Sequence, residues 1–284
     1  MAPPPADWPR LATSLRSDGF CVVPGVLDNP LLNRLKAAAD DRGERWQERV
    51  GDAYRAQGSM VALPHLRDPV FAELIAHPVA LEALRQLGPG TGRITFTDGY
   101  VISKPPRSPR LFWHFDWYGW TDPSAFGSDP VQVFAMYYLT DTDRQNGCLR
   151  VIPGSHRHRH PLHDLMSDGH VELSAATDLD RPEFGDAPGE IDVPLSAGDL
   201  LLGDARLLHA AHANTTDVRR SLVTLWYQPW YDRLPARVRA TLAAKTQQVP
   251  DTWPADLRQL VTSMQPPALA VAEPLPRSTL GPRV

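Results

Sequence analysis

The sequence contains few of the residues that mark several common protein classes. Among 284 residues there are two cysteines, Cys21 and Cys148, too few for a disulfide framework or a four-sulfur metal site. Lysine is also scarce and occurs only at Lys36, Lys104 and Lys245. No apolar run approaches the roughly 20 residues that a membrane-spanning helix needs. We therefore expect neither a disulfide-stapled scaffold nor a membrane protein.

The charge balance excludes further classes. The formal net charge is −4 and the isoelectric point is near 6.2, so the chain lacks the basic excess that nucleic-acid binding requires. Hydrophobic residues make up 42% and charged residues 22%, a composition typical of folded globular proteins. Residues 1–7 lack a basic segment followed by an apolar one, which predicts no signal peptide and a cytoplasmic location.

The hydrophobic pattern divides the chain into three parts. Residues from about 7 to 90 carry mostly helical spacing, with one short strand predicted at 19–24. From about 92 to 230 the period changes to two, and many short strands follow one another with turns between them, as in an antiparallel sandwich or barrel. Residues 232–284 are helical again and end in a proline-rich tail. The sequence predicts one domain over 1–284, with a β core between helical ends.

A possible metal site begins with the motif His114-Phe115-Asp116. In a strand, residues two apart point to the same side. The imidazole and the carboxylate would therefore face one cavity together. They supply two of the three ligands of the two-histidine, one-carboxylate triad that holds non-haem iron. An isolated motif of this length also occurs as a plain surface pair.

A second element makes the triad more plausible. His209 lies on or after a late strand, and Arg220 follows eleven residues later at the start of another. A hairpin could place both on one sheet face, where the guanidinium could bind a carboxylate with two hydrogen bonds. A core histidine and a solvated arginine are the alternatives.

Longer motifs connect these residues. The sequence resembles phytanoyl-CoA dioxygenase (PhyH)-type Fe(II)/2-oxoglutarate oxygenases from about Ser17 to Trp226. The most specific stretch is Asn146-Gly147-Cys148-Leu149 followed by residues 151–157, which read VIPGSHR. The other anchors are Asp18-Gly19-Phe20, Val22-Val23-Pro24-Gly25, Trp113-His114-Phe115-Asp116, and residues 209–214 with Arg220.

This resemblance implies a mainly β fold with a double-stranded β-helix, or jelly-roll, core and flanking helices. It implies that His114, Asp116 and His209 bind Fe(II), and that Arg220 pairs with the far carboxylate of the cosubstrate 2-oxoglutarate. O₂ would be the oxidant. Lys104 lies near a position where the family often contacts cosubstrate or substrate, although a solvated lysine at a strand end is equally expected there.

Several neighbours compete for these roles. His212 competes with His209, and Arg219 with Arg220. The family spacing favours His209 and Arg220, and adjacent strand residues such as the two arginines face opposite ways. Thr224 shares the face of Arg220 and is a further candidate for the cosubstrate site. The run from His156 to His160 alternates with arginine, which argues against a second metal site.

The presence of Asp116 favours oxygenation, because related radical halogenases have a small residue in place of that carboxylate. We expect hydroxylation of an unactivated C–H bond of a small-molecule metabolite, with release of succinate and CO₂. Specialised metabolism is the expected setting. Desaturation, epoxidation and cyclisation are alternatives within the family. A non-catalytic jelly-roll binding protein and a metal hydrolase are alternatives outside it.

The aromatic residues around the motif suggest where a substrate would bind. Trp113, Phe115 and Trp117 alternate with the ligands and should pack in the core. The candidates for substrate contact are Tyr118 and Trp120, on the metal side or in the following loop, and Arg150, beside the most specific turn.

Overall fold

Two antiparallel β-sheets face each other at the centre of the molecule. The computed structural model describes residues 7–51, 58–87, 92–165, 170–267 and 272–282. The strands are β1 (Phe20–Val23), β2 (Ser59–Ala62), β3 (Thr95–Lys104), β4 (Leu111–His114), β5 (Val133–Tyr138), β6 (Leu149–Val151), β7 (Ile191–Val193), β8 (Leu200–Asp204), β9 (His209–Ala211) and β10 (Arg220–Gln228). The larger sheet has six strands in the order β1-β8-β5-β10-β3-β2, and the smaller has four in the order β4-β9-β6-β7.

Helices cover the outside of this core. The α-helices are α1 (Trp8–Ser17), α2 (Asn29–Val50), α3 (Val70–Ile75), α4 (Pro78–Gln86), α5 (Leu162–Leu165), α6 (His170–Ser174), α7 (Ala236–Lys245) and α8 (Ala255–Met264). Short 3₁₀ turns occur at Leu63–His65, Pro123–Phe126, Pro182–Phe184 and Tyr231–Arg233. None of the helices in the described ranges is both long and apolar enough to cross a membrane.

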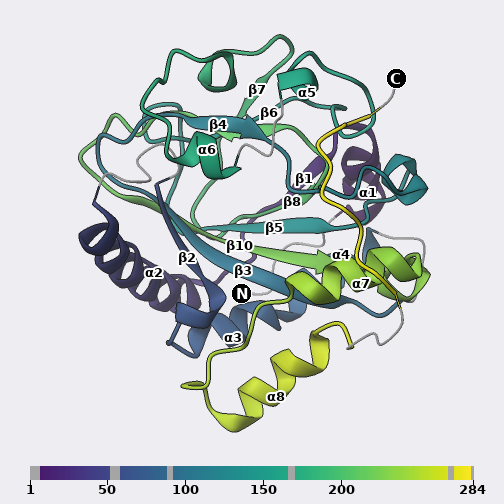
Figure 1. Cartoon of the computed structure of the whole chain (residues 1–284). Coiled ribbons are helices and arrows are strands. Elements are labelled where there is room, and N and C mark those ends of the chain that lie inside the picture. Colours follow the sequence, from purple (N-terminus) through teal and green to yellow (C-terminus); the bar gives the residue numbers. More distant parts are fainter. Residues whose placement is uncertain (1–6, 52–57, 88–91, 166–169, 268–271, 283–284) are drawn as a thin grey trace.

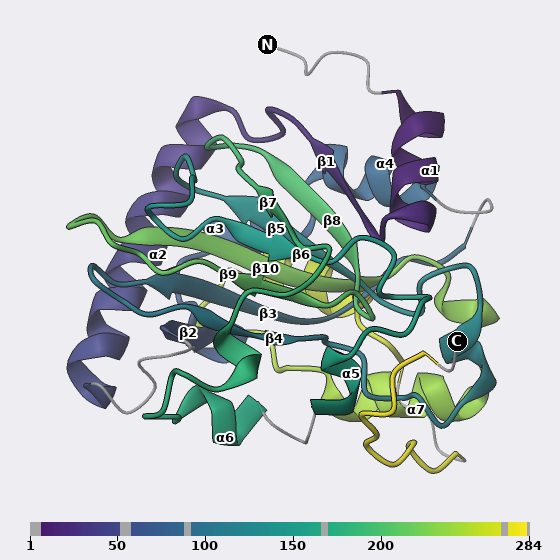
Figure 2. The ribbon, with the colours of Figure 1, turned by 90° about the horizontal axis from the view of Figure 1, so that it is seen from above.

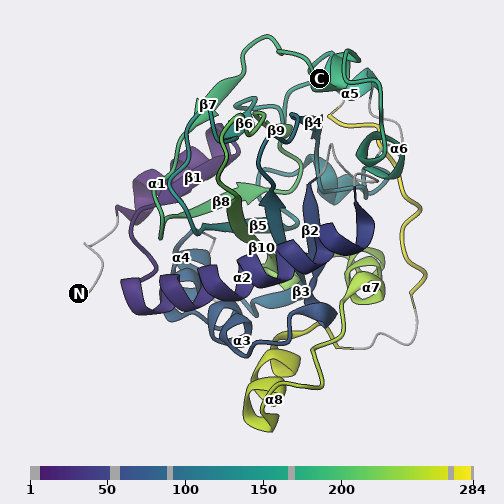
Figure 3. The same ribbon diagram turned by 90° about the vertical axis from the view of Figure 1, so that its left-hand side faces the viewer.

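The molecule is built in three layers. The smaller sheet lies above the larger sheet, and α2, α3 and α8 lie below it (Figure 1). Figure 3 shows α2 running across the outer face of the larger sheet, where it contacts β2, β3 and β10. Seen from above, α1 and α4 lie together at one end (Figure 2). These findings confirm the predicted jelly-roll core with flanking helices.

Each face of the larger sheet has its own apolar core. The outer face, with Val101, Val223 and Tyr227, packs against the N-terminal helices and α8. The inner face, with Met136, Leu222 and Trp226, packs against the smaller sheet. The strand β5 is buried at every position because it lies in the middle of the sheet with both faces covered, as its continuous apolar run predicts.

Three local details differ from the sequence-based expectation. A short edge strand, β2, lies within the part expected to be helical and pairs with β3. Helix α2 is capped by Asp28, whose carboxylate accepts from Leu31 N at 2.9 Å, and not by Asn29, which its position before Pro30 predicts as the cap. The strict alternation of β3 is broken where its register with β10 shifts between Trp226 and Tyr227.

Candidate active site

Two histidine rings lie side by side on adjacent strands of the smaller sheet. His114 on β4 and His209 on β9 are directly opposite in the antiparallel register, and their ring centroids are 4.1 Å apart. The Nδ1 atoms lie 3.0 Å from the carbonyl oxygens of Phe112 and Leu207, respectively. A ring that donates its Nδ1–H to a carbonyl presents the Nε2 lone pair for a metal ion.

A carboxylate completes the group just beyond the end of β4. The backbone N–H of Asp116 donates to Ala205 O at 2.7 Å, and Trp226 Nε1 donates to Asp116 Oδ2 at 3.1 Å. The Asp116 oxygens lie 3.9 Å from Nε2 of His114 and of His209. Ligand atoms from the three residues all lie within 4.8 Å of one another. This donor set suits an octahedral metal ion that keeps open positions for other ligands.

Two buried cations lie beside each other at the end of the cavity away from Asp116. Arg220 on β10 and Lys104 on β3 are directly opposite in register, and they are 4% and 2% exposed. Arg220 Nη2 donates to Gly147 O at 2.8 Å, and Lys104 Nζ donates to Pro109 O at 2.6 Å. Burial lowers the pKa of each, and the charge of Arg220 lowers the pKa of Lys104 further.

These cations have the environment of an anion-binding site. No carboxylate lies within ion-pair distance of either among the described residues, and Arg220 Nε and Nη1 have no hydrogen-bond partner there. The Thr224 hydroxyl, on the same face of β10, also lacks a partner in the described part of the chain. Buried charges and donors normally have partners in folded proteins. The arrangement therefore fits a ligand carboxylate.

The triad and Arg220 line one cavity between the two sheets, with a volume of about 70 Å³. A water molecule needs about 10–15 Å³ of such space, so the cavity has room for several small groups. Most of its walls are apolar. The lining residues are Met60, Ile102, Leu111, His114, Asp116, Met136, Tyr138, Leu149, His209, Ala211, Arg220, Leu222, Thr224 and Trp226.

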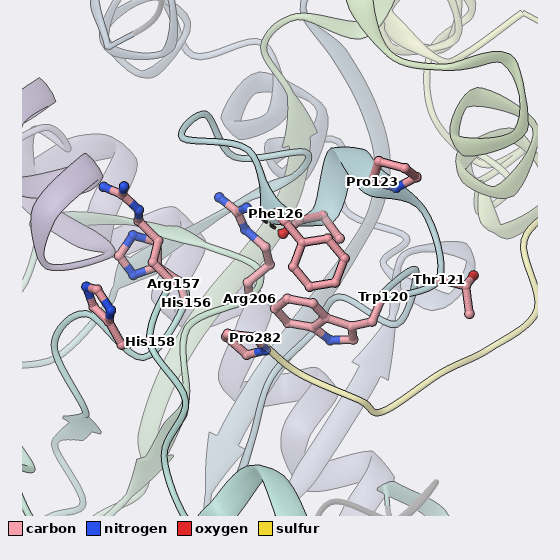
Figure 4. A pocket seen from close by; sticks show the side chains of 10 residues that line it. Trp120, Thr121, Pro123, Phe126, His156, Arg157, His158, Arg206 and Pro282 are labelled. Atoms are coloured by element: carbon pink, nitrogen blue, oxygen red, sulfur yellow. Dashed lines mark hydrogen bonds between the residues drawn. The ribbon is translucent and has the colours of Figure 1, made fainter. Parts of the chain in front are cut away.

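The residues expected to contact substrate lie elsewhere. Trp120 is fully buried and lines a separate pocket of about 540 Å³, where its ring packs on Phe126 (Figure 4). Tyr118 packs under Arg277, whose guanidinium carbon lies 3.8 Å from the ring centroid. Of the two placements expected for Tyr118 and Trp120, the structure shows the loop after β4 and not the metal side, because the chain leaves strand geometry after Asp116.

Arg150 has a structural environment. Its guanidinium pairs with Glu190, donates to Gly185 O at 2.9 Å and lies 4.8 Å from the Trp113 ring centroid. The side chain is fully buried and is not among the residues that line the cavity, so the structure places Arg150 apart from the triad. Trp113, Phe115 and Trp117 are buried in the core as expected.

The competing residues are separated from the site. His212 Nε2 lies 2.6 Å from Asp192 Oδ1, and these two residues form a group with Cys148 that is distinct from the triad. Arg219 points to the outer face and donates to Ser103 Oγ at 3.0 Å. His156 Nε2 lies 3.1 Å from the backbone oxygen of Arg16.

Two aromatic residues that line the cavity, Tyr138 and Trp226, were not predicted as site residues. Trp226 shares the face of Arg220 and Thr224 along β10, so the period-two pattern could have indicated it. Tyr138 lies near Arg220, and burial raises its pKa to about 12, which keeps the phenol neutral. The continuous apolar run of β5 gave no sign of which face Tyr138 would take.

Comparison with known proteins identifies the family. The profile of the phytanoyl-CoA dioxygenase (PhyH) family matches residues 15–222. The multifunctional dioxygenase prhA of Penicillium brasilianum is 23% identical over 78% of this chain and 72% of its own. The ectoine dioxygenase of Halomonas elongata is 29% identical over 76% of this chain and 69% of its own.

A solved structure agrees with this match. The epimerase SnoN, in a complex with Fe³⁺, alpha ketoglutarate and nogalamycin RO, is 27% identical, with a TM-score of 0.55 over 79% of this chain and 84% of its own. Since the family profile covers well over half of the sequence, the chain belongs to the phytanoyl-CoA dioxygenase (PhyH) family of Fe(II)/2-oxoglutarate dioxygenases.

Proposed function

We propose that this protein oxidises an unactivated C–H bond of a small-molecule metabolite with Fe(II), 2-oxoglutarate and O₂, and that the usual outcome is hydroxylation. His114, Asp116 and His209 would hold Fe(II). Arg220 would bind the far carboxylate of 2-oxoglutarate, with Lys104 adding positive charge and Thr224 a hydroxyl donor. Bound Fe(II) would supply the activation of O₂ that is coupled to conversion of 2-oxoglutarate into succinate and CO₂.

The observation that carries this proposal is the pairing of two sites in one cavity. A three-ligand metal site alone would also suit a hydrolase. A buried guanidinium without a counter-ion, on the same cavity, adds a specific requirement for an anion. A dicarboxylate that chelates a metal at one end and meets a guanidinium at the other satisfies both requirements.

The protein's own residues would fix geometry and keep water out. Gly147 O holds one nitrogen of Arg220, so the remaining donors stay aimed at the ligand. Trp226 holds one oxygen of Asp116, which limits how that carboxylate can turn toward the metal. Apolar walls from Met136, Leu149 and Leu222 exclude water that would compete for a reactive site.

The small-molecule assignment rests on the shape of the cavity and on the relatives. The cavity is narrow and mainly apolar, which suits part of a small molecule and not a polymer. SnoN comes from nogalamycin biosynthesis. The relative from Halomonas elongata is named an ectoine dioxygenase. We infer a similar metabolic role here.

The first test is binding followed by turnover. Under anaerobic conditions, the purified protein should take up one Ni(II), an inert stand-in for Fe(II), and then 2-oxoglutarate, measured by calorimetry. With Fe(II) and O₂, a panel of candidate metabolites should then accelerate succinate release. Binding of metal without 2-oxoglutarate would contradict the proposal in favour of a metal-binding jelly roll, and O₂-independent turnover would favour a hydrolase.

Product mass then separates hydroxylation from desaturation, cyclisation and epimerisation. Hydroxylation adds one oxygen atom, whereas desaturation or cyclisation removes two hydrogen atoms and epimerisation leaves the mass unchanged. The relatives include both an epimerase and a carbocyclase. We expect the product to gain one oxygen atom, and a product without added oxygen would contradict hydroxylation while leaving the cofactor assignment intact.

A further inference from the structure

An acidic side chain continues the inner face of the larger sheet beyond the cavity. Asp98 on β3 is directly opposite Trp226 on β10, and directly opposite residues of an antiparallel pair point to the same face. Trp226 lines the cavity and donates to Asp116. Asp98 therefore lies on the cavity face, next to the residue that supports the metal-binding carboxylate.

The irregularity in β3 explains why Asp98 takes this position. The register between β3 and β10 shifts after Trp226, so Phe96 and Tyr227 lie on the outer face, with ring centroids 5.6 Å apart in the outer core. Tyr100, two residues after Asp98, remains on the inner face and meets the Trp226 ring edge-on at 5.6 Å. Such bulges often redirect side chains beside functional sites.

The Asp98 carboxylate retains capacity to accept hydrogen bonds. The side chain is half-buried, and its hydrogen bond comes from the neighbouring Thr97 hydroxyl at 2.6 Å. No ion pair reaches Asp98 within the described ranges, since Lys245, the nearby cation, donates instead to Gln132 Oε1 at 2.6 Å. An ionised carboxylate has about four acceptor positions, so most of its capacity is open.

Burial of the Asp98 carboxylate is not offset by a paired cation among the described residues, so a donor group of a bound molecule would stabilise its ionised form. Burial raises the pKa of Asp98; the charge of Lys245 opposes this shift and the charge of Asp116 adds to it. Tyr100 also faces this region, with a pKa that burial raises to about 12, so it is neutral. The inner face of the larger sheet is thus cationic at Arg220 and acidic beyond Trp226. This separates a region suited to the carboxylate of 2-oxoglutarate from one suited to a hydrogen-bond donor.

We propose that Asp98 anchors the substrate by accepting a hydrogen bond from an ammonium or hydroxyl group, while an apolar part of the same molecule reaches past Trp226 toward the metal. The substrate is therefore an amino- or hydroxyl-bearing molecule with an apolar body. This inference rests on the proposed function and makes Asp98 the residue that selects substrate and sets which carbon faces the metal.

The role of Asp98 is tested with three small molecules that share a benzene ring and differ in its substituent: benzylamine, benzyl alcohol and toluene. Each is titrated into the full-length protein loaded with Ni(II) and 2-oxoglutarate. The wild type should bind benzylamine or benzyl alcohol about tenfold or more tightly than toluene, because a hydrogen bond to a charged group contributes roughly this much. Asp98→Asn should remove most of the advantage of benzylamine and leave toluene unchanged. A larger loss for benzylamine than for benzyl alcohol assigns an ammonium group, and a similar loss for both assigns a hydroxyl.

The matched control is Asp129→Asn, which removes the charge of another half-buried aspartate, one that faces Arg16 at 3.7 Å. It should leave all three affinities unchanged, and a melting curve of each variant checks that it is folded. The inference is overturned if the wild type binds the three probes equally or not at all, or if Asp98→Asn behaves as the wild type. Failure of the proposed function itself would appear earlier, as absent uptake of Ni(II) and 2-oxoglutarate.

Discussion

Both faces of the larger sheet at β10 carry polar residues, but they differ in how many of these residues have partners among the described residues. On the outer face, Arg219 donates to Ser103, and Ser221 donates to Asp40 at 2.7 Å. On the inner face, two nitrogens of Arg220 and the hydroxyl of Thr224 lack partners among the described residues. Unsatisfied buried groups are costly for stability, so the inner face indicates a site whose missing partners are ligands.

This difference predicts that inner-face changes alter binding and catalysis, whereas outer-face changes alter stability. The largest effect is expected at the triad. His114→Ala and Asp116→Ala should each abolish turnover, because a facial triad with one ligand missing no longer fixes the metal. Succinate release and Ni(II) binding measure this.

Both variants should remain folded, since each removes a side chain that faces the cavity and not the outer core. A circular dichroism spectrum like that of the wild type would show this. If either variant made succinate at the rate of the wild type, the assignment of the metal ligands would be wrong.

The adjacent arginines give the next largest effect. Arg220→Ala should weaken 2-oxoglutarate binding by about a hundredfold, because truncating one partner of a buried charged pair typically costs 2–5 kcal/mol. Arg219→Ala, its matched control on the outer face, should leave that affinity unchanged and lower the free energy of unfolding by about 1 kcal/mol. Calorimetric titration of 2-oxoglutarate into each Ni(II)-loaded variant measures the change in affinity for 2-oxoglutarate.

A denaturant titration of Arg219→Ala measures the expected loss in the free energy of unfolding. An unchanged affinity for 2-oxoglutarate in Arg220→Ala would move the anion site to Lys104. Equal losses in the two variants would mean that the faces of β10 do not differ as the hydrogen bonds indicate.

Trp226 should have an intermediate effect. Trp226→Phe keeps a ring against Tyr100 but removes the donor to Asp116, and losing a partner of a metal ligand typically weakens metal binding by 10–100-fold. We expect about tenfold weaker Ni(II) binding. Trp253→Phe is the control, because it removes a buried indole donor to Leu66 O at 2.8 Å far from the cavity, and a similar loss of metal affinity there would contradict a positioning role for Trp226.

The sequence predicted those features that follow from strand periodicity and motif spacing. Residues two apart in β4 had to share a face, so His114 and Asp116 could be paired, and the choice between Arg219 and Arg220 became a choice between faces. The family spacing then predicted His209 as the third metal ligand. The jelly roll followed from many short strands without intervening helices.

Features that depend on breaks in periodicity could not be predicted. Tyr118 and Trp120 follow Asp116 where β4 has ended, so strand alternation could not decide whether they lie on the metal side or in the loop. The bulge that places Asp98 and Phe96 on opposite faces is a property of the pairing between β3 and β10, and single-sequence alternation does not reveal it. The pairing of Arg150 with Glu190, forty residues away in sequence, was likewise not visible in the local pattern.

The smallest and most discriminating effect concerns two hydroxyls on β10. Thr224→Val replaces a hydroxyl that has no partner in the described residues with a methyl group, so it should raise the free energy of unfolding of the ligand-free protein by about 1 kcal/mol. Ser221→Ala on the outer face removes a hydroxyl that bonds Asp40 and Ser103, so it should lower that free energy by about the same amount.

With 2-oxoglutarate present, Thr224→Val should lose its stability advantage, because the Thr224 hydroxyl then has a partner in the wild type. Thermal melting of both variants with and without Ni(II) and 2-oxoglutarate measures these opposite signs. If Thr224→Val destabilised the ligand-free protein as much as Ser221→Ala, the Thr224 hydroxyl would already be satisfied within the fold, and the inner face would lose one of its two markers of a ligand site.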